Sequence, residues 1–137
     1  MKTDERLGLL VWFRLSRFYN QSIRETNQHL KKWDLSAAQF DVLVQIGAGD
    51  RLTQQELGQK LFVTKGNVTQ LLSKMEQLDL IQREQEGKTK YLSLTEKGKA
   101  LYEDVVPPQE RFQAAQFCKL DREEQKQLLA LLRKLQS

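Results

Sequence analysis

The stretch VTKGNVTQLLSKM, residues 63–75, decides the fold of this 137-residue chain. At helical spacing, one side of it is apolar and is formed by Val68, Leu71, Leu72 and Met75. The other side carries amides, hydroxyls and lysines, and it carries no acidic residue. Such a helix would pack on a core with its apolar side and hold hydrogen-bonding groups outward, towards a partner or simply towards water.

The residues before this stretch predict a second, shorter helix. Thr53-Gln-Gln-Glu56 fits a capping box, in which the first hydroxyl and the fourth side chain each bond the other residue's backbone. Leu57 and Leu61 then fall on one inward side. After Phe62-Val63 we expect Thr64 to cap the quoted helix. Two helices separated by a turn of about three residues form a helix-turn-helix.

The residues after the quoted helix change to a strand pattern. Residues 81–84 and 90–94 read as two strands, and the second alternates Leu92 and Leu94 with polar neighbours. Between them, residues 85–89 form the expected hairpin tip, where Gly87 supplies a permissive backbone. A β-hairpin directly after a helix-turn-helix is a wing.

The N-terminal segment, roughly residues 4–32, predicts an unusually long helix with a wide apolar surface. It contains no proline and a single glycine, Gly8. At about 1.5 Å per residue it would extend roughly 40 Å, more than a domain of this size can cover by itself. We therefore expect a second copy of the chain to pack against it. Ser36-Ala-Ala-Gln39 is another capping box and opens the next helix, with Phe40 and Leu43 inward.

The C-terminal segment predicts two more helices. Thr95 caps the first, which we expect Pro107-Pro108 to break or kink before it resumes to about Lys119. Asp121-Arg-Glu-Glu124 caps the last helix, which is rich in leucine. The expected fold is mainly α with a small β-hairpin wing. A winged helix-turn-helix domain would span residues 34–100, and helical dimerisation segments would span residues 1–33 and 101–137.

Composition narrows the class of protein. The formal net charge is +4, which suits an anionic partner without establishing one. The longest apolar run, residues 7–13, is too short to span a membrane, and it lacks the small-residue cleavage site of a signal peptide. The single cysteine, Cys118, cannot form an internal disulfide. These features predict a cytoplasmic protein without a membrane partner.

Metal and catalytic sites are not indicated. His29 is the sole histidine, so a histidine zinc cluster cannot form within one chain, and we expect this residue to pack or to face solvent. No nucleophile elbow or Ser/His/Asp set is visible. We predict no metal, no cofactor and no enzymatic activity.

The polar side of residues 63–75 suits DNA base edges. The second helix of a helix-turn-helix lies in the major groove with its N-terminal residues at the bases, which are read by amides, lysines and hydroxyls. The predicted base readers are Lys65, Asn67, Thr69 and Gln70. Positively charged and hydroxyl side chains near the same surface would contact the DNA backbone. The predicted backbone and wing contacts are Thr53, Thr64, Lys74, Lys88 and Lys90.

Over essentially its full length, the chain resembles the MarR-type winged-helix transcriptional regulators. The resemblance rests on the order of elements and on four stretches: LSAAQFDVL at 35–43, TQQELG at 53–58, VTKGNVT at 63–69 and LSLTEKG at 92–98. It implies a homodimer held by N- and C-terminal helices, with a recognition helix in the major groove and a wing in the minor groove. It also implies a repressor that binds a pseudo-palindromic operator in double-stranded DNA and is released by a small molecule or an oxidant.

Two residues depart from the family pattern. The wing of such proteins usually carries Asp-x-Arg, where this chain has Glu86-Gly87-Lys88. Lysine cannot make the planar fork contact of arginine, so minor-groove readout should be weaker or purely electrostatic. The usual glycine between recognition helix and wing is Asp79, which tolerates a left-handed backbone better than most residues.

The resemblance also places an effector pocket between the dimerisation helices and the winged domain. Trp12, Tyr19 and Phe112 could line it, although aromatic residues at helical spacing more often form core or dimer seam. Relatives that sense oxidants carry a reactive cysteine near the N-terminus, so we expect Cys118 to be a buried or half-buried small hydrophobic residue. Two other functions remain open: a winged-helix module that binds another protein, as an antirepressor or assembly factor, and an architectural protein without effector.

Overall fold

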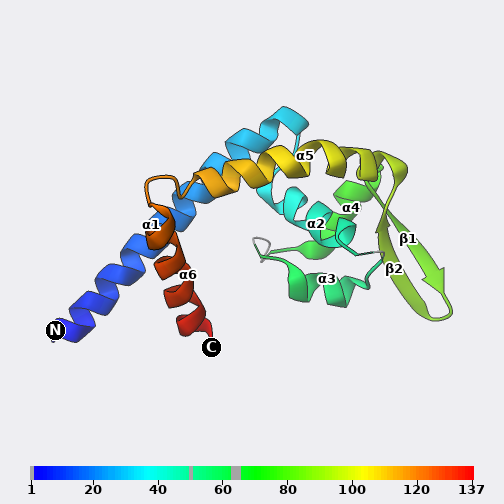
Figure 1. Ribbon diagram of the computed structural model, residues 1–137. Helices are drawn as coiled ribbons and strands as arrows, with labels where there is room; N and C mark the ends of the chain where they lie inside the picture. Colours follow the sequence, from blue (N-terminus) through cyan, green and yellow to red (C-terminus); the bar gives the residue numbers. More distant parts are fainter. Residues whose placement is uncertain (1, 50, 63–65) are drawn as a thin grey trace.

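The computed structural model describes residues 2–49, 51–62 and 66–137 (Figure 1). It is mainly helical with one antiparallel hairpin, as the sequence predicts. The elements in chain order are α1 (Thr3–Leu30), η1 (Lys31–Trp33), α2 (Ala37–Gly47), α3 (Gln54–Lys60), α4 (Val68–Gln77), β1 (Ile81–Glu86), β2 (Thr89–Leu94), α5 (Glu96–Ala115) and α6 (Arg122–Gln136).

The core lies where α2, α3, α4 and the hairpin meet, below α5 and the C-terminal end of α1 (Figure 1). Leu43, Leu57 and Leu72 contribute one side chain from each of the three inner helices, and all are fully buried. Leu92 of β2 joins them at 1% exposure. Burial of apolar side chains supplies the main favourable free energy of folding, so this cluster holds the winged body together.

The helix starts follow the capping signals. Ser36 with Gln39, Thr53 with Glu56 and Asp121 with Glu124 each form a reciprocal capping box. In each, the fourth side chain accepts a hydrogen bond from the backbone of the cap residue, while the cap side chain accepts one in return. All three predicted starts are confirmed.

The start of α4 differs from the prediction. Its N-cap is Asn67, whose Oδ1 accepts a hydrogen bond from the Gln70 backbone N–H at 3.0 Å. Thr64, the predicted cap, lies outside the described residues. The prediction was wrong because a shorter helix with an Asn cap satisfies the same orphan backbone donors, and Asn and Thr are both good caps.

The turn between α3 and α4 is anchored from α2. The side chain of Asp41 is buried, and its Oδ2 accepts a hydrogen bond from the Phe62 backbone N–H at 2.8 Å. A charge-assisted hydrogen bond to a buried carboxylate is stronger than a neutral one. The end of α3 is therefore fixed relative to α2, ahead of α4.

The wing is longer and its tip tighter than predicted. β1 and β2 pair from Ile81 opposite Leu94 to Glu86 opposite Thr89, which leaves a two-residue turn of Gly87 and Lys88. Gly87 has φ of 63°, as the first position of a type II′ turn requires. Cross-strand pairing that matches this turn extends the strands into residues that the sequence assigned to a loop.

The link from α4 to the wing contains Asp79 in the left-handed region, with φ of 60°. This confirms that Asp can occupy the place of the usual glycine. The Thr95 hydroxyl, which also caps α5, donates to the Asp79 carbonyl at 2.5 Å. Nearby, Gly98 lets α5 approach the Leu80 backbone closely, because a Cβ on Gly98 would lie 2.1 Å from the Leu80 carbonyl oxygen.

The sequence predicted that Pro107 and Pro108 break or kink α5, and the helix runs through both prolines without a break. Each proline leaves one carbonyl four residues earlier without its helical donor. Those carbonyls belong to Glu103 and Asp104, which are exposed and can bond water. Val105 and Val106 are buried beside them, so tertiary packing holds the helix together. The helix ends at Ala115, and a turn rather than helix follows to Lys119.

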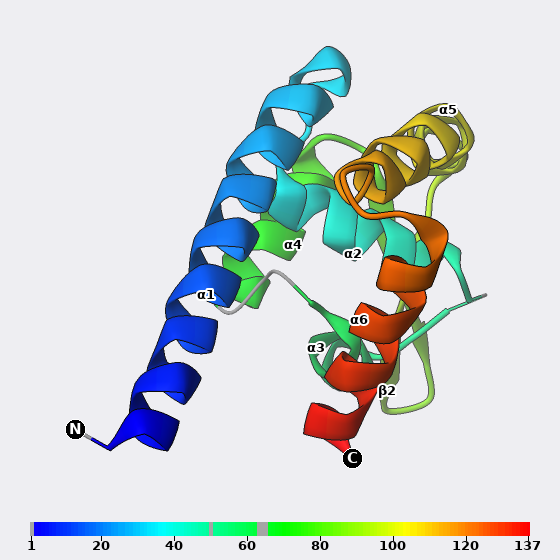
Figure 2. The same cartoon turned by 60° about the vertical axis from the view of Figure 1, so that its left-hand side comes forward.

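Helices α1 and α6 extend away from the winged body, and both termini lie at the same end of the molecule (Figures 1 and 2). In α1 the buried residues are Thr26 and Leu30, both near its C-terminal end, and α6 has no buried residue. Within the described parts of the chain, no helix is both long and apolar enough to cross a membrane.

The close approach at Gly98 gives a stability prediction. Gly98→Ala should lower the free energy of unfolding by about 1–3 kcal/mol, because the new methyl group meets backbone that cannot move aside cheaply. Gly58→Ala is the matched control: it lies inside α3 with open space around it, and should raise stability by up to about 1 kcal/mol. Urea unfolding of both variants would test this, and a Gly98→Ala protein as stable as wild type would contradict it.

Candidate nucleic-acid interface

Helix α4 is buried along one side and exposed along the other. Leu72 and Met75 are fully buried, and Leu71 is half-buried. The opposite side, here called the polar face of α4, consists of Asn67, Thr69, Gln70, Ser73 and Lys74, all exposed. An open groove of about 510 Å³ follows it, lined by Asn67, Gln70, Leu71, Ser73, Lys74 and Gln77. The helix thus offers hydrogen-bonding groups in a hollow on the surface.

The predicted base readers differ in how they are held. Gln70 is exposed, and its backbone rather than its side chain takes part in the cap. Asn67 uses its side-chain carbonyl as the cap, which leaves the amide NH₂ as the group that could contact a ligand. Thr69 accepts a hydrogen bond from Gln54 Nε2 of α3 at 3.0 Å. Lys65 lies outside the described residues.

The predicted backbone contacts come from three elements. Thr53 caps α3, and Lys74 stands on the polar face of α4. Lys88 sits in the turn at the tip of the wing, and Lys90 follows on β2; both are exposed. Exposed lysines therefore stand on α4 and on the wing.

The tip of the wing is braced by an arginine that the sequence analysis missed. Arg51 Nη1 lies 2.6 Å from Glu86 Oε2, and its guanidinium carbon lies 4.0 Å from the centre of the Tyr91 ring. The neighbouring Leu52 forms a β-bridge with Leu92, which brings Arg51 alongside β2. No local pattern signals this contact, because Arg51 and Glu86 are far apart in sequence.

A second missed arginine links the wing to α4. Arg83 Nε lies 2.8 Å from Glu76 Oε1, and Arg83 Nη1 lies 3.3 Å from Gln54 Oε1. Arg83 pairs in register with buried Leu92, so it stands on the inward side of β1. A charged residue on the inward side of a strand was the signal available in the sequence, because strand side chains alternate between faces.

Two ionisable groups near this surface are perturbed. The Thr53 backbone N–H and then its hydroxyl bond the Glu56 carboxylate and lower the pKa of Glu56 below its usual value. The hydrogen bond to Glu86 raises the pKa of Arg51. A lowered carboxyl pKa means that the α3 capping box is complete above the ordinary Glu pKa and is lost as the pH falls through the folded value. Both groups are charged at neutral pH.

The three proposed effector residues are not enclosed in the single chain. Trp12 and Tyr19 are 64% and 49% exposed on α1. Phe112 of α5 is half-buried and stacks on His29, with ring centres 4.3 Å apart. His29 Nδ1 also lies 2.6 Å from Gln109 Oε1, so His29 packs between α1 and α5, as expected.

Cys118 is exposed, and the prediction of a buried or half-buried residue was wrong. It lies in the turn after α5, which leaves the helix earlier than expected and so carries the side chain to the surface. Among residues 2–49, 51–62 and 66–137, no group of three or more His, Cys, Asp or Glu side chains could hold a metal ion.

Comparison with known proteins agrees with this geometry. Residues 33–90 match the model of the MarR family. An uncharacterized HTH-type transcriptional regulator of Bacillus cereus is 46% identical over 133 residues, which cover 96% of this chain and 90% of the relative.

Solved structures share the fold over nearly the whole chain. A MarR family transcriptional regulator from Silicibacter pomeroyi superposes with a TM-score of 0.86 at 20% identity, covering 98% of this chain and 96% of that one. The oxidized form of MarR from Escherichia coli gives 0.78 at 26% identity, covering 96% and 94%. These proteins are transcription regulators rather than enzymes. The chain belongs to the MarR family of helix-turn-helix transcriptional regulators.

Proposed function

We propose that the protein is a homodimeric repressor that binds a pseudo-palindromic site in double-stranded DNA. The polar face of α4 carries this proposal, because it is exposed, lies beside a groove and has no acidic residue. Asn67, Thr69 and Gln70 stand at the N-terminal end of α4, the end that meets base edges in helix-turn-helix proteins. Lys65, just before the described start of α4, completes the proposed set of base readers.

The proposed backbone contacts surround these base readers. Thr53 and Thr64 would lie against the phosphate backbone, and Lys74, Lys88 and Lys90 would neutralise phosphate charge. At the wing tip, Arg51 is already paired with Glu86, while Lys88 projects from the turn. Lys88 would therefore act as the charge that the wing brings to the DNA.

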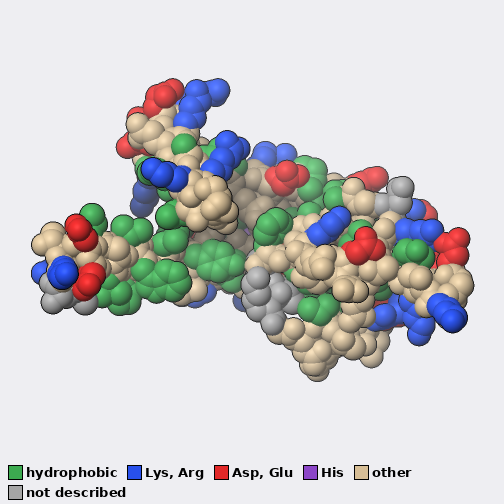
Figure 3. Space-filling model, turned by 90° about the horizontal axis from the view of Figure 1, so that it is seen from below, with side chains coloured by type: hydrophobic (Ala, Val, Ile, Leu, Met, Phe, Trp, Pro, Cys, Tyr) green, Lys and Arg blue, Asp and Glu red, His purple; other side chains and the backbone are tan. Residues whose placement is uncertain are grey.

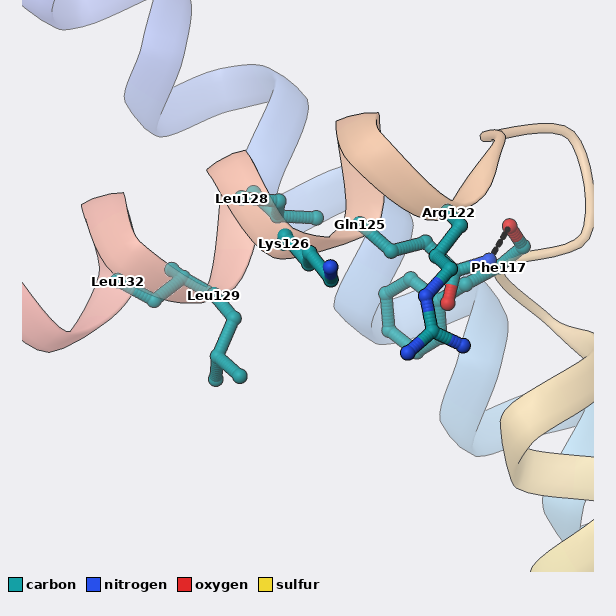
Figure 4. Close-up of a pocket in the computed structure, with 7 residues that line it drawn as sticks. All are labelled: Phe117, Arg122, Gln125, Lys126, Leu128, Leu129 and Leu132. Carbon is teal, nitrogen blue, oxygen red and sulfur yellow. Dashed lines mark hydrogen bonds between the residues drawn. The ribbon is translucent and has the colours of Figure 1, made fainter.

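The dimer would form through α1 and α6, in the segments 1–33 and 101–137, with residues 34–100 as the DNA-binding domain. Apolar side chains gather along α1 in Figure 3. Exposed large hydrophobic residues of this helix include Trp12 at 64% and Phe13 at 55% exposure. A groove of about 400 Å³ runs along α6, where Phe117, Leu128, Leu129 and Leu132 are accompanied by Arg122, Gln125 and Lys126 (Figure 4). An apolar surface of this length is unusual on a monomer and suits a second copy.

Release by a small molecule is the second part of the proposal. Trp12 and Tyr19 of α1 and Phe112 of α5 would come to line a pocket when α1 of the partner covers them. Thermal unfolding of the dimer with a panel of aromatic acids and amphipathic amines should then show ligand-dependent stabilisation. A protein that acts without effector would show none.

The experiment that tests the function is selection of genomic fragments by the purified protein at about 150 mM salt, with excess competitor DNA and sequencing of the bound fraction. We expect a pseudo-palindrome with half-sites about one helical turn apart. Recovery of no sequence by a folded protein would contradict the regulator and favour the protein-binding module.

Gln70→Ala should relax preference at one base position of the recovered site. The loss of its amide should cost about 1–3 kcal/mol on the preferred sequence and little on random DNA. Gln77→Ala is the matched control, since Gln77 lines the same groove at the C-terminal end of α4. Equal losses on specific and random DNA for Gln70→Ala would refute a base-reading role.

Lys88→Ala should weaken binding to all sequences alike. It removes one phosphate contact, so the slope of log affinity against log salt should fall by about one. The control is Lys32→Ala in η1, an exposed lysine outside the proposed interface, which should leave the slope unchanged. An unchanged slope for Lys88→Ala would show that the wing tip does not meet phosphate.

Leu129→Glu should separate the dimer. Leu129 lines the α6 groove at 48% exposure, and burial of an unpaired carboxylate there should raise the dimer dissociation constant by about a hundredfold or more. Gln127→Glu adds the same charge on the opposite side of α6 and should leave the dimer intact. Sedimentation velocity would measure both, and a dimeric Leu129→Glu protein would place the interface elsewhere.

A further inference from the structure

The side chains that hold Thr69 form a continuous chain of hydrogen bonds across three elements. Glu76 of α4 bonds Arg83 of β1 at 2.8 Å, and Arg83 bonds Gln54 of α3 at 3.3 Å. Gln54 then bonds Thr69, back on α4, at 3.0 Å. This series of hydrogen bonds begins at Glu76 on α4 and ends at Thr69 on the same helix, seven residues earlier. Thr69 lies at the end of α4 that would meet the bases.

The direction of every bond in this chain is fixed by chemistry. A guanidinium can only donate, so the Gln54 atom facing Arg83 must be the carbonyl oxygen Oε1. The other end of the amide, Nε2, therefore faces Thr69, and it too can only donate. This settles the amide orientation, which is otherwise interchangeable. Thr69 Oγ1 is consequently an acceptor in its bond with Gln54.

The Thr69 hydroxyl proton is not used in the bond with Gln54, where Thr69 Oγ1 accepts. A hydroxyl has a single donor, and Gln54 leaves that donor unused. Within residues 2–49, 51–62 and 66–137, the Thr69 hydroxyl donates no hydrogen bond, and Thr69 is exposed on the polar face of α4. The proton is available to an acceptor outside the protein.

We propose that Gln54 and Arg83 are positioning residues that make Thr69 a hydrogen-bond donor towards DNA. This inference rests on the proposed function. It names the DNA partner by its chemistry: an acceptor atom, such as a purine N7, guanine O6, thymine O4 or a phosphate oxygen. The exocyclic amines of adenine and cytosine are donors, so they could be met only by the second lone pair of Thr69 Oγ1 and not by its proton.

The positioning is supported by the strength of the first link. Arg83 is held by a charge-assisted hydrogen bond to Glu76, and its side chain is 30% exposed. Both Gln54 and Glu76 are half-buried. Arg83 on β1 therefore fixes the orientation of the Gln54 amide on α3, and that orientation turns Nε2 towards Thr69 on α4.

Gln54→Glu is the variant that reverses this pattern. A carboxylate only accepts, so one oxygen can still bond Arg83 while the other takes the Thr69 proton. The hydroxyl then offers only lone pairs to DNA. Glutamate at the first turn of α3 is favourable for the helix, so the fold should persist, as an unchanged Tm would verify.

Gln54→Glu changes two things: it adds a negative charge, and it makes Thr69 the donor in its bond with residue 54. A second protein background, in which Thr69 is replaced by valine, separates these two effects. Gln54→Glu is measured both in the otherwise unchanged protein and in the Thr69→Val variant, on the fragment with the highest affinity in the genomic selection. The charge acts alike in both backgrounds, whereas the reversal requires the hydroxyl. We expect Gln54→Glu to reduce affinity by about tenfold more when the hydroxyl is present than in the Thr69→Val background, roughly the loss of one hydrogen bond. Equal losses in both would overturn the inference.

NMR of the free protein tests the hydrogen bond between Gln54 and Thr69 without DNA, and so independently of the proposed regulator function. In NMR spectra of the free protein, Thr69→Val should shift the side-chain amide N–H resonances of Gln54 and accelerate their exchange with water, because Nε2 loses its acceptor. Gln85, whose Nε2 donates to the Gly87 carbonyl at 3.1 Å, is the internal control and should not change. Unshifted Gln54 resonances would overturn the inference, whether or not an operator is found.

Discussion

The burial of Leu72 and Met75 sets the rotation of α4 about its own axis, and the interface depends on that rotation. Two fully buried side chains three residues apart leave one orientation in which both remain in the core. Asn67, Gln70 and Lys74 then face outward. The arginine on β1 adds a second constraint, because its bonds to Glu76 and Gln54 tie the wing strand to the helices on either side of the turn. The recognition helix and the wing therefore keep one relative placement.

Much of the fold could be predicted because its signals are local. A capping box places both partners within four residues, so Ser36, Thr53 and Asp121 identified three helix starts that the structure confirms. The hairpin was visible through the alternation around Leu92, and Asp79 adopts the left-handed backbone expected of it. The polar side of α4 could be read from helical periodicity alone.

What could not be predicted depends on contacts between distant residues or on competing local solutions. Asn67 rather than Thr64 caps α4, and sequence offers no way to rank two good caps three residues apart. Pro107 and Pro108 do not break α5, because buried neighbours compensate for the missing donors and solvent bonds the exposed carbonyls. The contacts of Arg83 and Arg51 were missed for the same reason: each partner is on another element. The exposure of Cys118 follows from the early end of α5.

We propose that the polar face of α4 meets base edges in the major groove. Dimethyl sulfate modifies guanine N7, which lies in that groove, so protection of the selected fragment by the dimer tests the claim directly. Protected guanines are expected in two clusters about one helical turn apart, with weaker protection at one position of each cluster in Gln70→Ala. Binding that leaves every guanine N7 as reactive as in bare DNA would contradict it, since the protein would then hold the duplex without entering its major groove.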